Sequence, residues 1–191
     1  ICLSSSNPTV TDVRITNNNT NGSGGGIYCS NSDPTFNNVL IDNNTASLGF
    51  TGGTYFEYNS DPVLYNATII NNNGAIKCEN NSNPSITNSI IYDNNETPII
   101  FSQSLAPNSI TINYSQIEGG ESSINTNNHG TVNWGSGNID SDPLFVDGTN
   151  GDYRLSNYSP AIGAGTTTGA PTTDIDGNNR IQPGGSNPDM G

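Results

Sequence analysis

Four segments of this chain align with one another without a gap, each on a proline that follows Asn or Asp. The prolines are Pro8, Pro34, Pro62 and Pro84. They lie 26, 28 and 22 residues apart, and a fifth, looser copy at 109–120 has Ile110 in the place of the proline. A repeat of this length is typical of a solenoid, in which neighbouring repeats stack and bury a shared core. The repeats therefore constrain the fold of the chain far more than its function.

Within each copy, the second, fifth and seventh residues after the proline are apolar or small. These residues are Val10, Val13, Ile15; Phe36, Val39, Ile41; Leu64, Ala67, Ile69; Ile86, Ser89, Ile91; and Ile112, Ser115, Ile117. A step of two residues is that of a β-strand, whose alternate side chains face opposite ways. The step of three residues predicts a bend between two short strands. We expect these three columns to form the core of the stack.

A further short strand is expected before each proline, where Ile27 and Cys29 alternate around an outward Tyr28. The outward column of this strand is expected to contain Tyr28, Phe56 and Lys77. Each rung then has about three short strands joined by Asn-, Gly- and Ser-rich corners. The chain is therefore predicted to be all-β, a parallel β-helix of about five to six rungs.

The three cysteines are Cys2, Cys29 and Cys78, and we expect them to share one column as buried thiols. Cys2 and Cys29 would be close enough for a disulfide, although side chains stacked in register fit its torsion poorly. The chain has no C-x-x-C pair and a single histidine, which argues against a zinc site.

Two asparagine-rich columns mark one corner of the rung, at the ninth and tenth positions after the proline. The ninth position contains Asn17, Asn43, Asn71 and Asp93, and the tenth contains Asn18, Asn44, Asn72 and Asn94. Asparagine tolerates left-handed backbone, and its amide can donate and accept hydrogen bonds between rungs. We assign the ninth-position residues to a structural ladder at the turn rather than to a polar binding stripe.

The chain carries 17 acidic and four basic residues, which gives a formal net charge of −13. This charge argues against binding to nucleic acid, which depends on Lys and Arg, and against an anionic membrane surface. No apolar run is long enough to cross a bilayer, so no direct insertion into a membrane is expected. The composition is compatible with an extracellular environment and with divalent cations.

The segment GGGIYCSNSDPTFNNVLIDNNTAS at 24–47 resembles the repeats of bacterial secreted, right-handed parallel β-helix proteins of the pectate-lyase-like superfamily. Three pieces of the tail, at 138–147, 151–165 and 173–180, are similar to the C-terminal region of a choice-of-anchor cell-surface subgroup. The resemblance implies a right-handed coil, bacterial secretion, and an extracellular or cell-surface location. Gly163 departs from the subgroup, which usually has Asp there.

We expect residues 1–137 to form the rungs and residues 138–191 to form a C-terminal capping segment of the same domain that covers the last rung. The chain stops at DMG, where members of the subgroup usually continue, so the anchoring route is left open. Ile1 and Cys2 begin in the middle of a strand. We expect the uncapped N-terminal rung to pair with other copies of the chain.

The superfamily includes polysaccharide lyases, so an enzyme has to be weighed against a non-catalytic module. A lyase needs a base, usually Lys or Arg, beside carboxylates, and the four basic residues are scattered through the repeats and tail. A hydrolase needs paired carboxylates, and the outward Asp42 and Glu118 lie three rungs apart. We therefore interpret the chain as non-catalytic, with a polysaccharide lyase or glycoside hydrolase as the alternative. Ice binding by threonine columns is a third hypothesis, which Val63 and Tyr65 weaken.

The sequence thus favours a structural or adhesive extracellular module that binds surface glycans or further copies of itself. The one ion-binding site that the sequence suggests is a calcium site at Asp174, Asp176 and Asn178, in the segment TDIDGNN. Alternating oxygens and a glycine turn are typical of part of a calcium loop. A simple Asp/Gly turn is the alternative, because no later glutamate closes the loop. No other cofactor is expected.

Overall fold

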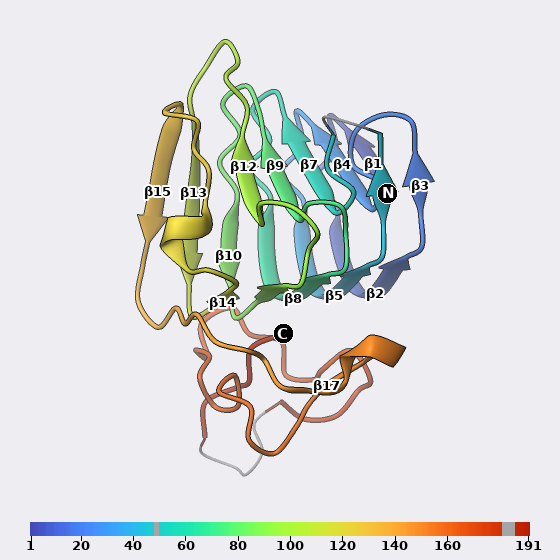
Figure 1. The fold of residues 1–191 in the computed structure, drawn as a ribbon, viewed down its shortest axis with the longest axis vertical. Helices are drawn as coiled ribbons and strands as arrows, with labels where there is room; N and C mark the ends of the chain where they lie inside the picture. Colours follow the sequence, from blue (N-terminus) through green and yellow to red (C-terminus); the bar gives the residue numbers. More distant parts are fainter. Residues whose placement is uncertain (48–49, 181–185) are drawn as a thin grey trace.

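The computed structural model describes residues 1–47, 50–180 and 186–191. They form a coil of stacked parallel strands with a long tail beneath it (Figure 1). One parallel sheet contains β1 (Cys2–Ser4), β4 (Ile27–Ser30), β7 (Thr54–Glu57), β9 (Ile76–Cys78) and β12 (Ile99–Phe101). Each of these strands pairs with its equivalent in the next rung. The chain is therefore a β-solenoid, as its repeats predict.

The second sheet has eight strands and contains the proline-led repeats. It comprises β2 (Thr9–Thr16), β5 (Thr35–Asp42), β8 (Val63–Ile70), β10 (Ser85–Thr87), β11 (Ile90–Tyr92), β13 (Asn108–Asn113), β14 (Gln116–Ile117) and β15 (Gly130–Trp134). Short strands β3 (Asn19–Thr20) and β6 (Thr45–Ala46) pair at one corner, and the 3-10 turn η1 (Glu121–Ser123) follows the fifth repeat. The aligned repeats of the sequence are thus aligned strands of this sheet.

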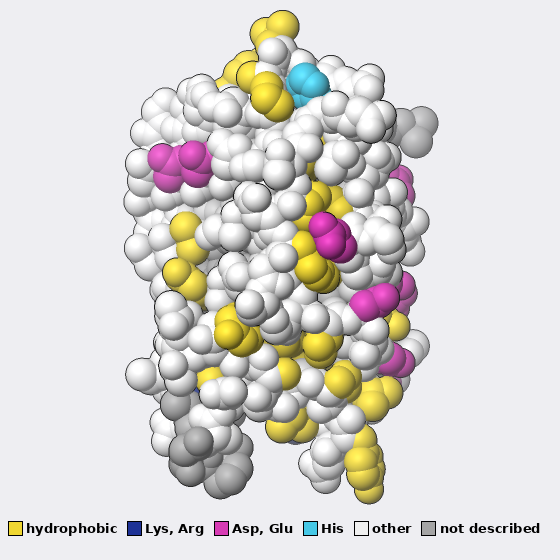
Figure 2. All heavy atoms as spheres, turned by 90° about the vertical axis from the view of Figure 1, so that its left-hand side faces the viewer, with side chains coloured by type: hydrophobic (Ala, Val, Ile, Leu, Met, Phe, Trp, Pro, Cys, Tyr) yellow, Lys and Arg dark blue, Asp and Glu magenta, His cyan; other side chains and the backbone are white. Residues whose placement is uncertain are grey.

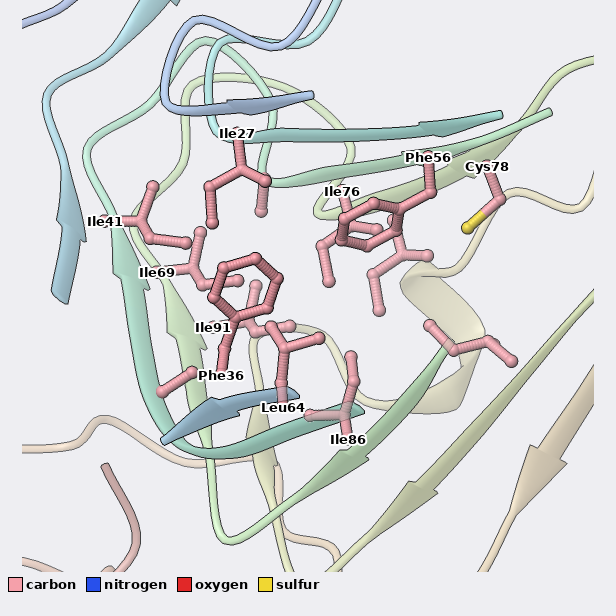
Figure 3. Packing of buried hydrophobic residues seen from close by; sticks show 14 of the residues in the cluster. Ile27, Phe36, Ile41, Phe56, Leu64, Ile69, Ile76, Cys78, Ile86 and Ile91 are labelled. Carbon is pink, nitrogen blue, oxygen red and sulfur yellow. The ribbon is translucent and has the colours of Figure 1, made fainter. Parts of the chain in front are cut away.

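The interior of the coil contains the three predicted columns. Phe36 lies between Val10 and Leu64 in the parallel register, and Ile41 lies between Ile15 and Ile69. From the second rung onward, every residue of these columns is buried. Side chains from the two sheets point into the same space, as Ile27 and Phe56 do opposite Leu64 (Figure 3). The core of the coil is therefore one thin, continuous column of apolar side chains.

The predicted bend within each repeat lies at the fourth residue after the proline, which adopts a left-handed backbone in all five copies. These residues are Asp12, Asn38, Asn66, Asn88 and Tyr114, with φ of 56°, 52°, 50°, 54° and 46°. Four of them are Asp or Asn, which tolerate this conformation better than most residues. The bend turns the strand while the side chains before and after it remain in the core.

The expectation that all three cysteines share one column is wrong. Cys2 pairs with Tyr28, so Leu3 takes the inward place next to Cys29, and Cys2 is exposed. Cys29 and Cys78 are buried, and all three thiols are free. The first rung has no preceding repeat to fix its alignment, and a shift of one residue moves a side chain to the opposite face of a strand.

The same one-residue ambiguity affects the outward column of this sheet. Tyr28 pairs with Tyr55, and Tyr55 pairs with Lys77, whereas Phe56 is fully buried in the core. The expected outward place for Phe56 is therefore wrong. Tyr55 and Phe56 are adjacent aromatic residues, so composition alone does not say which of them faces inward.

The buried asparagine ladder runs through the tenth column, one residue after the positions we assigned to it. Asn44 donates from Nδ2 to Oδ1 of Asn72 (3.0 Å), and Asn72 donates in the same way to Asn94 (3.0 Å). In the ninth column, Asn17, Asn43, Asn71 and Asp93 form the left-handed corner itself, with φ of 58°, 54°, 56° and 52°. They face outward, where Asn43 donates to Asn17 (2.6 Å). Each corner therefore uses one residue for backbone geometry and the next for the buried ladder.

A second buried ladder is formed by the residues that lie two places before the proline in each copy. The backbone N–H of Ser32 donates to the hydroxyl of Ser60 (3.2 Å), and that of Ser60 donates to the hydroxyl of Ser82 (3.3 Å). The column ends at Asn108, whose Oδ1 accepts from Ser82 (3.0 Å). These side chains satisfy backbone donors at a corner where the sheets are interrupted, as buried polar groups require.

The tail does not cover the last rung, contrary to our expectation. After Ser141 it turns back and lies along the side of the coil, beneath β2, β5 and β8 (Figure 1). It contains β16 (Phe145–Asp147), η2 (Gly148–Asn150) and β17 (Asp152–Leu155), with β16 and β17 antiparallel. The end face formed by β15 shows hydrophobic side chains in its middle (Figure 2). Phe145, Leu155, Ala161 and Met190 of the tail pack on a side face that the sequence pattern marked as outward.

A cleft between the coil and the tail

A hollow with a volume of about 480 Å³ lies between the tail and the outward face of the proline-led strands. Its apolar lining comes from both sides of the cleft: Leu40, Ile90, Leu155, Ile162 and Met190. Arg14, Arg154 and Arg180 line it as well, which are three of the four basic residues of the chain. An apolar hollow with a few converging polar groups is the usual form of a ligand site.

Arg180 is the most enclosed of these arginines, with 8% of its surface exposed. Its Nη2 donates to Oδ1 of Asn38 (2.6 Å), and its Nη1 donates to the backbone oxygen of Gly191 (2.8 Å). Burial lowers the pKa of Arg180, which the charges of Asp174 and Asp189 partly offset. An arginine nevertheless stays protonated in proteins. Arg180 is therefore a fixed positive charge where the last part of the tail meets the coil.

The other two arginines lie at the mouth of the cleft, and each contacts a carboxylate of the tail. Nη2 of Arg14 lies 2.6 Å from Oδ1 of Asp176, and both side chains are about half exposed. Nη2 of Arg154 lies 2.5 Å from Oδ2 of Asp152. The hydrogen bond from Arg154 lowers the pKa of Asp152 below its usual value. Charged groups of both signs are therefore fixed around the opening.

The left-handed asparagines of the bend bind the tail on the inner side of the cleft. Nδ2 of Asn38 donates to the carbonyl of Thr173 (2.8 Å), and Nδ2 of Asn66 donates to that of Asp189 (3.0 Å). Asn88 makes two such bonds to one residue, since Nδ2 donates to the Thr166 carbonyl (2.7 Å) and Oδ1 accepts its N–H (2.8 Å). In the second, third and fourth rungs, one amide side chain thus contacts the main chain of the tail.

The bend asparagines are not among the functional residues that the sequence predicts. The available signal was the recurrence of Asn38, Asn66 and Asn88 at the same place in three copies. That recurrence is explained by the bend alone, because the position requires a left-handed residue. Contact with a non-repeating tail leaves no periodic trace in the sequence.

The predicted calcium residues lie at the rim of the cleft, in a tight turn. Oδ1 of Asp174 accepts the backbone N–H groups of Asp176 (2.9 Å) and Asn178 (2.8 Å), while Asp176 extends to Arg14. Burial alone would raise the pKa of Asp174, but the hydrogen bonds from Asn178 and Asp176 and the charge of Arg180 lower it. Within residues 1–47, 50–180 and 186–191, no three His, Cys, Asp or Glu side chains form a metal-binding group. Calcium binding at this turn stays a prediction.

The two outward carboxylates that we considered as a hydrolase pair have separate partners. Asp42 accepts from the hydroxyl of Tyr153 in the tail (2.8 Å), and Nδ2 of Asn71 donates to the same hydroxyl (2.7 Å). Burial, and next the hydrogen bond to Asp42, raise the pKa of Tyr153. Glu118 accepts the backbone N–H of Asp93 (2.8 Å). Asp42 therefore helps to hold the tail.

The only lysine lies on the other sheet, away from the cleft. Nζ of Lys77 is 5.3 Å from the centre of the Tyr55 ring, and the Tyr55 hydroxyl donates to Glu79. Tyr28 stacks on Tyr55 at 6.2 Å between ring centres and donates to Glu57. Burial and the bond to Glu57 raise the pKa of Tyr28 to about 12. This face is a closely packed set of aromatic and charged side chains rather than a hollow.

The stacked parallel rungs, the buried ladders and the lateral tail define a β-solenoid, and comparison with known proteins gives its family. Residues 1–141 match the family model described as a right handed beta helix region, and the chain belongs to this family. No curated protein and no solved structure matches the chain. No helix in the described part of the chain is long and apolar enough to cross a membrane.

Proposed function

We propose that the chain is a non-catalytic structural and adhesive module of an extracellular or bacterial cell-surface protein, and that it binds a glycan in the cleft between coil and tail. The observation that carries the proposal is the cleft itself. It combines an apolar lining with arginine, aspartate and asparagine side chains whose positions are fixed by hydrogen bonds. Such groups can bind paired hydroxyls while the apolar surface contacts the faces of sugar rings.

A non-catalytic role is supported by what the charged residues of the cleft already do. Arg14 and Arg154 are paired with aspartates, and Arg180 is bound to Asn38 and to the backbone of the tail. A catalytic arginine has to be free to reach the substrate, whereas each of these three is already bound to aspartate, asparagine or backbone groups. Lys77, the other basic residue, lies on the other sheet. Arg14 and Arg180 join the tail to the coil, and Arg154 is paired within the tail.

A polysaccharide lyase or glycoside hydrolase is the second candidate, and one observation favours it. Asp152, Asp174 and Asp176 line the same hollow as the three arginines. Incubation with pectin, alginate, glycosaminoglycans and neutral glycans separates the two functions. We expect neither unsaturated products nor new reducing ends. Turnover that disappears in Asp176→Asn or Asp152→Asn would show that the protein is an enzyme.

Glycan binding is tested directly on a glycan array with the full chain. We expect signal for a subset of glycans, and we expect Arg14→Gln to lose that signal because it removes a cation from the mouth of the cleft. Lys77→Gln is the matched control, since it removes a cation from the other sheet. Equal loss in both variants, or no signal for the parent chain, would contradict binding in the cleft.

Four expectations from the sequence stay predictions beside this proposal. Pairing of copies through the first rung is tested by light scattering at rising concentration. Ice binding is tested by thermal hysteresis, and calcium binding at Asp174 is tested by calorimetry with millimolar calcium. A secreted or cell-surface location is tested by fractionation of the producing cell.

A further inference from the structure

The coil and the tail have separate hydrophobic clusters. Every member of the larger cluster lies between Leu3 and Trp134, so the coil's core contains none of the described residues of the tail. In the smaller cluster, Ala161, Met190 and their neighbours in the tail pack on Ile90, Tyr92 and Tyr114 of the coil. The described part of the tail therefore packs on the outer surface of the coil and not in its interior.

The tail crosses the side of the coil in a zigzag, and its contacts extend from the first rung to the fifth. Tyr153 reaches Asp42 and Asn71 in the second and third rungs, and Thr166 returns to Asn88 in the fourth. Asp176 then reaches Arg14 in the first rung, and Asp189 returns to Asn66 in the third. Arg14 and Asp42, in the first and second rungs, lie four and three rungs from Gln116 in the fifth, beside which the tail begins.

The connection between the two units is a short and strained turn. After Ser141, whose carbonyl accepts from Gln116 (2.5 Å), the chain passes through Asp142 and Pro143 to Leu144. Leu144 has φ of 53°, and its N–H donates to Oδ1 of Asp142 (2.8 Å). Few residues other than glycine, asparagine and aspartate adopt this conformation, and leucine does so only at a cost. Leu144 is 39% exposed, so it packs only in part against the rest of the protein.

We propose that the tail of this protein exchanges between two copies, so that each tail binds the side of the other copy's coil. The occupant of the surface is a second copy, because the exchanged interface has the same contacts as the interface within one chain. Exchange also releases Leu144 from its left-handed turn as the connection opens. Short hinges under strain favour such exchange, and closed pairs related by a twofold axis are its usual product.

The test uses two full-length variants with opposite charge reversals, Arg14→Asp and Asp176→Arg. Each variant alone places like charges together in a monomer, at the pair that lies 2.6 Å apart in the parent. In an exchanged dimer of one Arg14→Asp chain and one Asp176→Arg chain, both coil–tail contacts again join opposite charges. We expect the mixture, unfolded and refolded together at high concentration, to give more dimer than either variant alone, measured by size-exclusion chromatography and native mass spectrometry.

The double variant Arg14→Asp with Asp176→Arg is the matched control, because it restores the pair within one chain and should behave like the parent. Leu144→Gly tests the hinge separately: glycine adopts the turn without strain, so this variant should form less dimer at every concentration. The proposal is overturned if the mixture gives only monomer. It is equally overturned if the mixture yields no more dimer than the separate variants, because the chains then associate through another surface.

Discussion

In the coil, each rung repeats the contacts of the rung before it, whereas the tail has no sequence repeat, and the bend asparagines of three rungs bind three different residues of it. Apolar columns and ladders of asparagine and serine side chains stabilise the coil, all directed into its interior. Single hydrogen bonds, two arginine contacts and a small cluster hold the tail on the outside of the coil. The difference teaches that one chain can contain a cooperative scaffold and a separately attached segment, and that the cleft lies at their boundary.

The largest effect is expected from the core of the coil. Phe36→Ala should lower the free energy of unfolding by about 3–5 kcal/mol, because the ring is fully buried and leaves a cavity. Chemical denaturation followed by circular dichroism measures the change. Leu155→Ala, in the half-buried cluster of the tail, is the matched control and should cost less. Equal losses would mean that coil and tail unfold as one unit.

The asparagine ladder should give the next largest effect. Asn44→Ala removes bonds to the Ile15 carbonyl (2.9 Å) and to Asn72 (3.0 Å), and each buried group left unpaired costs about 1–3 kcal/mol. Asn43→Gly, one residue earlier, keeps the left-handed corner and should change stability by less than about 0.5 kcal/mol. If Asn43→Gly lowered the unfolding temperature more than Asn44→Ala, the stabilising ladder would be at the ninth position instead.

Loss of one bend asparagine should loosen the tail and leave the coil intact. Asn38→Gly keeps the left-handed backbone but removes the acceptor of Arg180, and a hydrogen bond to a charged group contributes about 1.5–3 kcal/mol. Hydrogen exchange should rise in the tail, for example at the Arg180 amide, and stay low in β5 and β8. Asn31→Gly has the same backbone conformation away from the tail and should have no effect. Faster exchange throughout the coil would contradict the separation of the two regions.

Acid should release the tail before it affects the coil. The pKa of Asp174 is lowered in the folded chain, so its contribution to stability is complete above the usual aspartate pKa of about 3.9. That contribution is lost as the pH falls through the lower, folded pKa. The buried ladders are amides and hydroxyls, which do not titrate there. Limited proteolysis with an acid-active protease should cut the tail first, and Asp174→Asn should remove this dependence on pH.

The smallest effect is expected at the mouth of the cleft. Arg14→Gln breaks a pair whose side chains are both about half exposed, and such pairs contribute about 0–1 kcal/mol. We expect a minor shift in thermal stability that disappears at high salt. A loss as large as that of Phe36→Ala would mean that this pair supports the whole coil.

The sequence predicted the coil because its repeats leave a periodic record. Phe36, Leu64 and Ile86 fall in one column on alignment alone, and the structure places them next to one another. Alignment could not separate two adjacent residues of the same type. Asn43 and Asn44 are chemically identical, and only the geometry of the corner decides which of them enters the core. Cys2 was misplaced for a related reason, since the first rung has no earlier copy for alignment.

The cleft could be predicted only in pieces. Asp174, Asp176 and Asn178 were recognised as a turn rich in oxygens, but their partner Arg14 is far away in the sequence. Contacts between a repeated surface and a tail that does not repeat are single events, and each depends on the path of the tail. The sequence shows that the tail has apolar residues to bury, such as Leu155 and Ile162, without showing which face of the coil receives them.

The corner that follows the asparagine ladder also explains how the rungs differ in length. The connection from Asn44 to β7 is longer than that from Asn72 to β9, yet Thr54 and Ile76 still pair in register. The ladder asparagines fix the position of each rung before the extra residues begin, so the number of residues in this connection does not change the packing of the core. Loops at this corner can lengthen, shorten or be replaced over evolutionary time, and the same position suits the grafting of foreign peptides onto the coil.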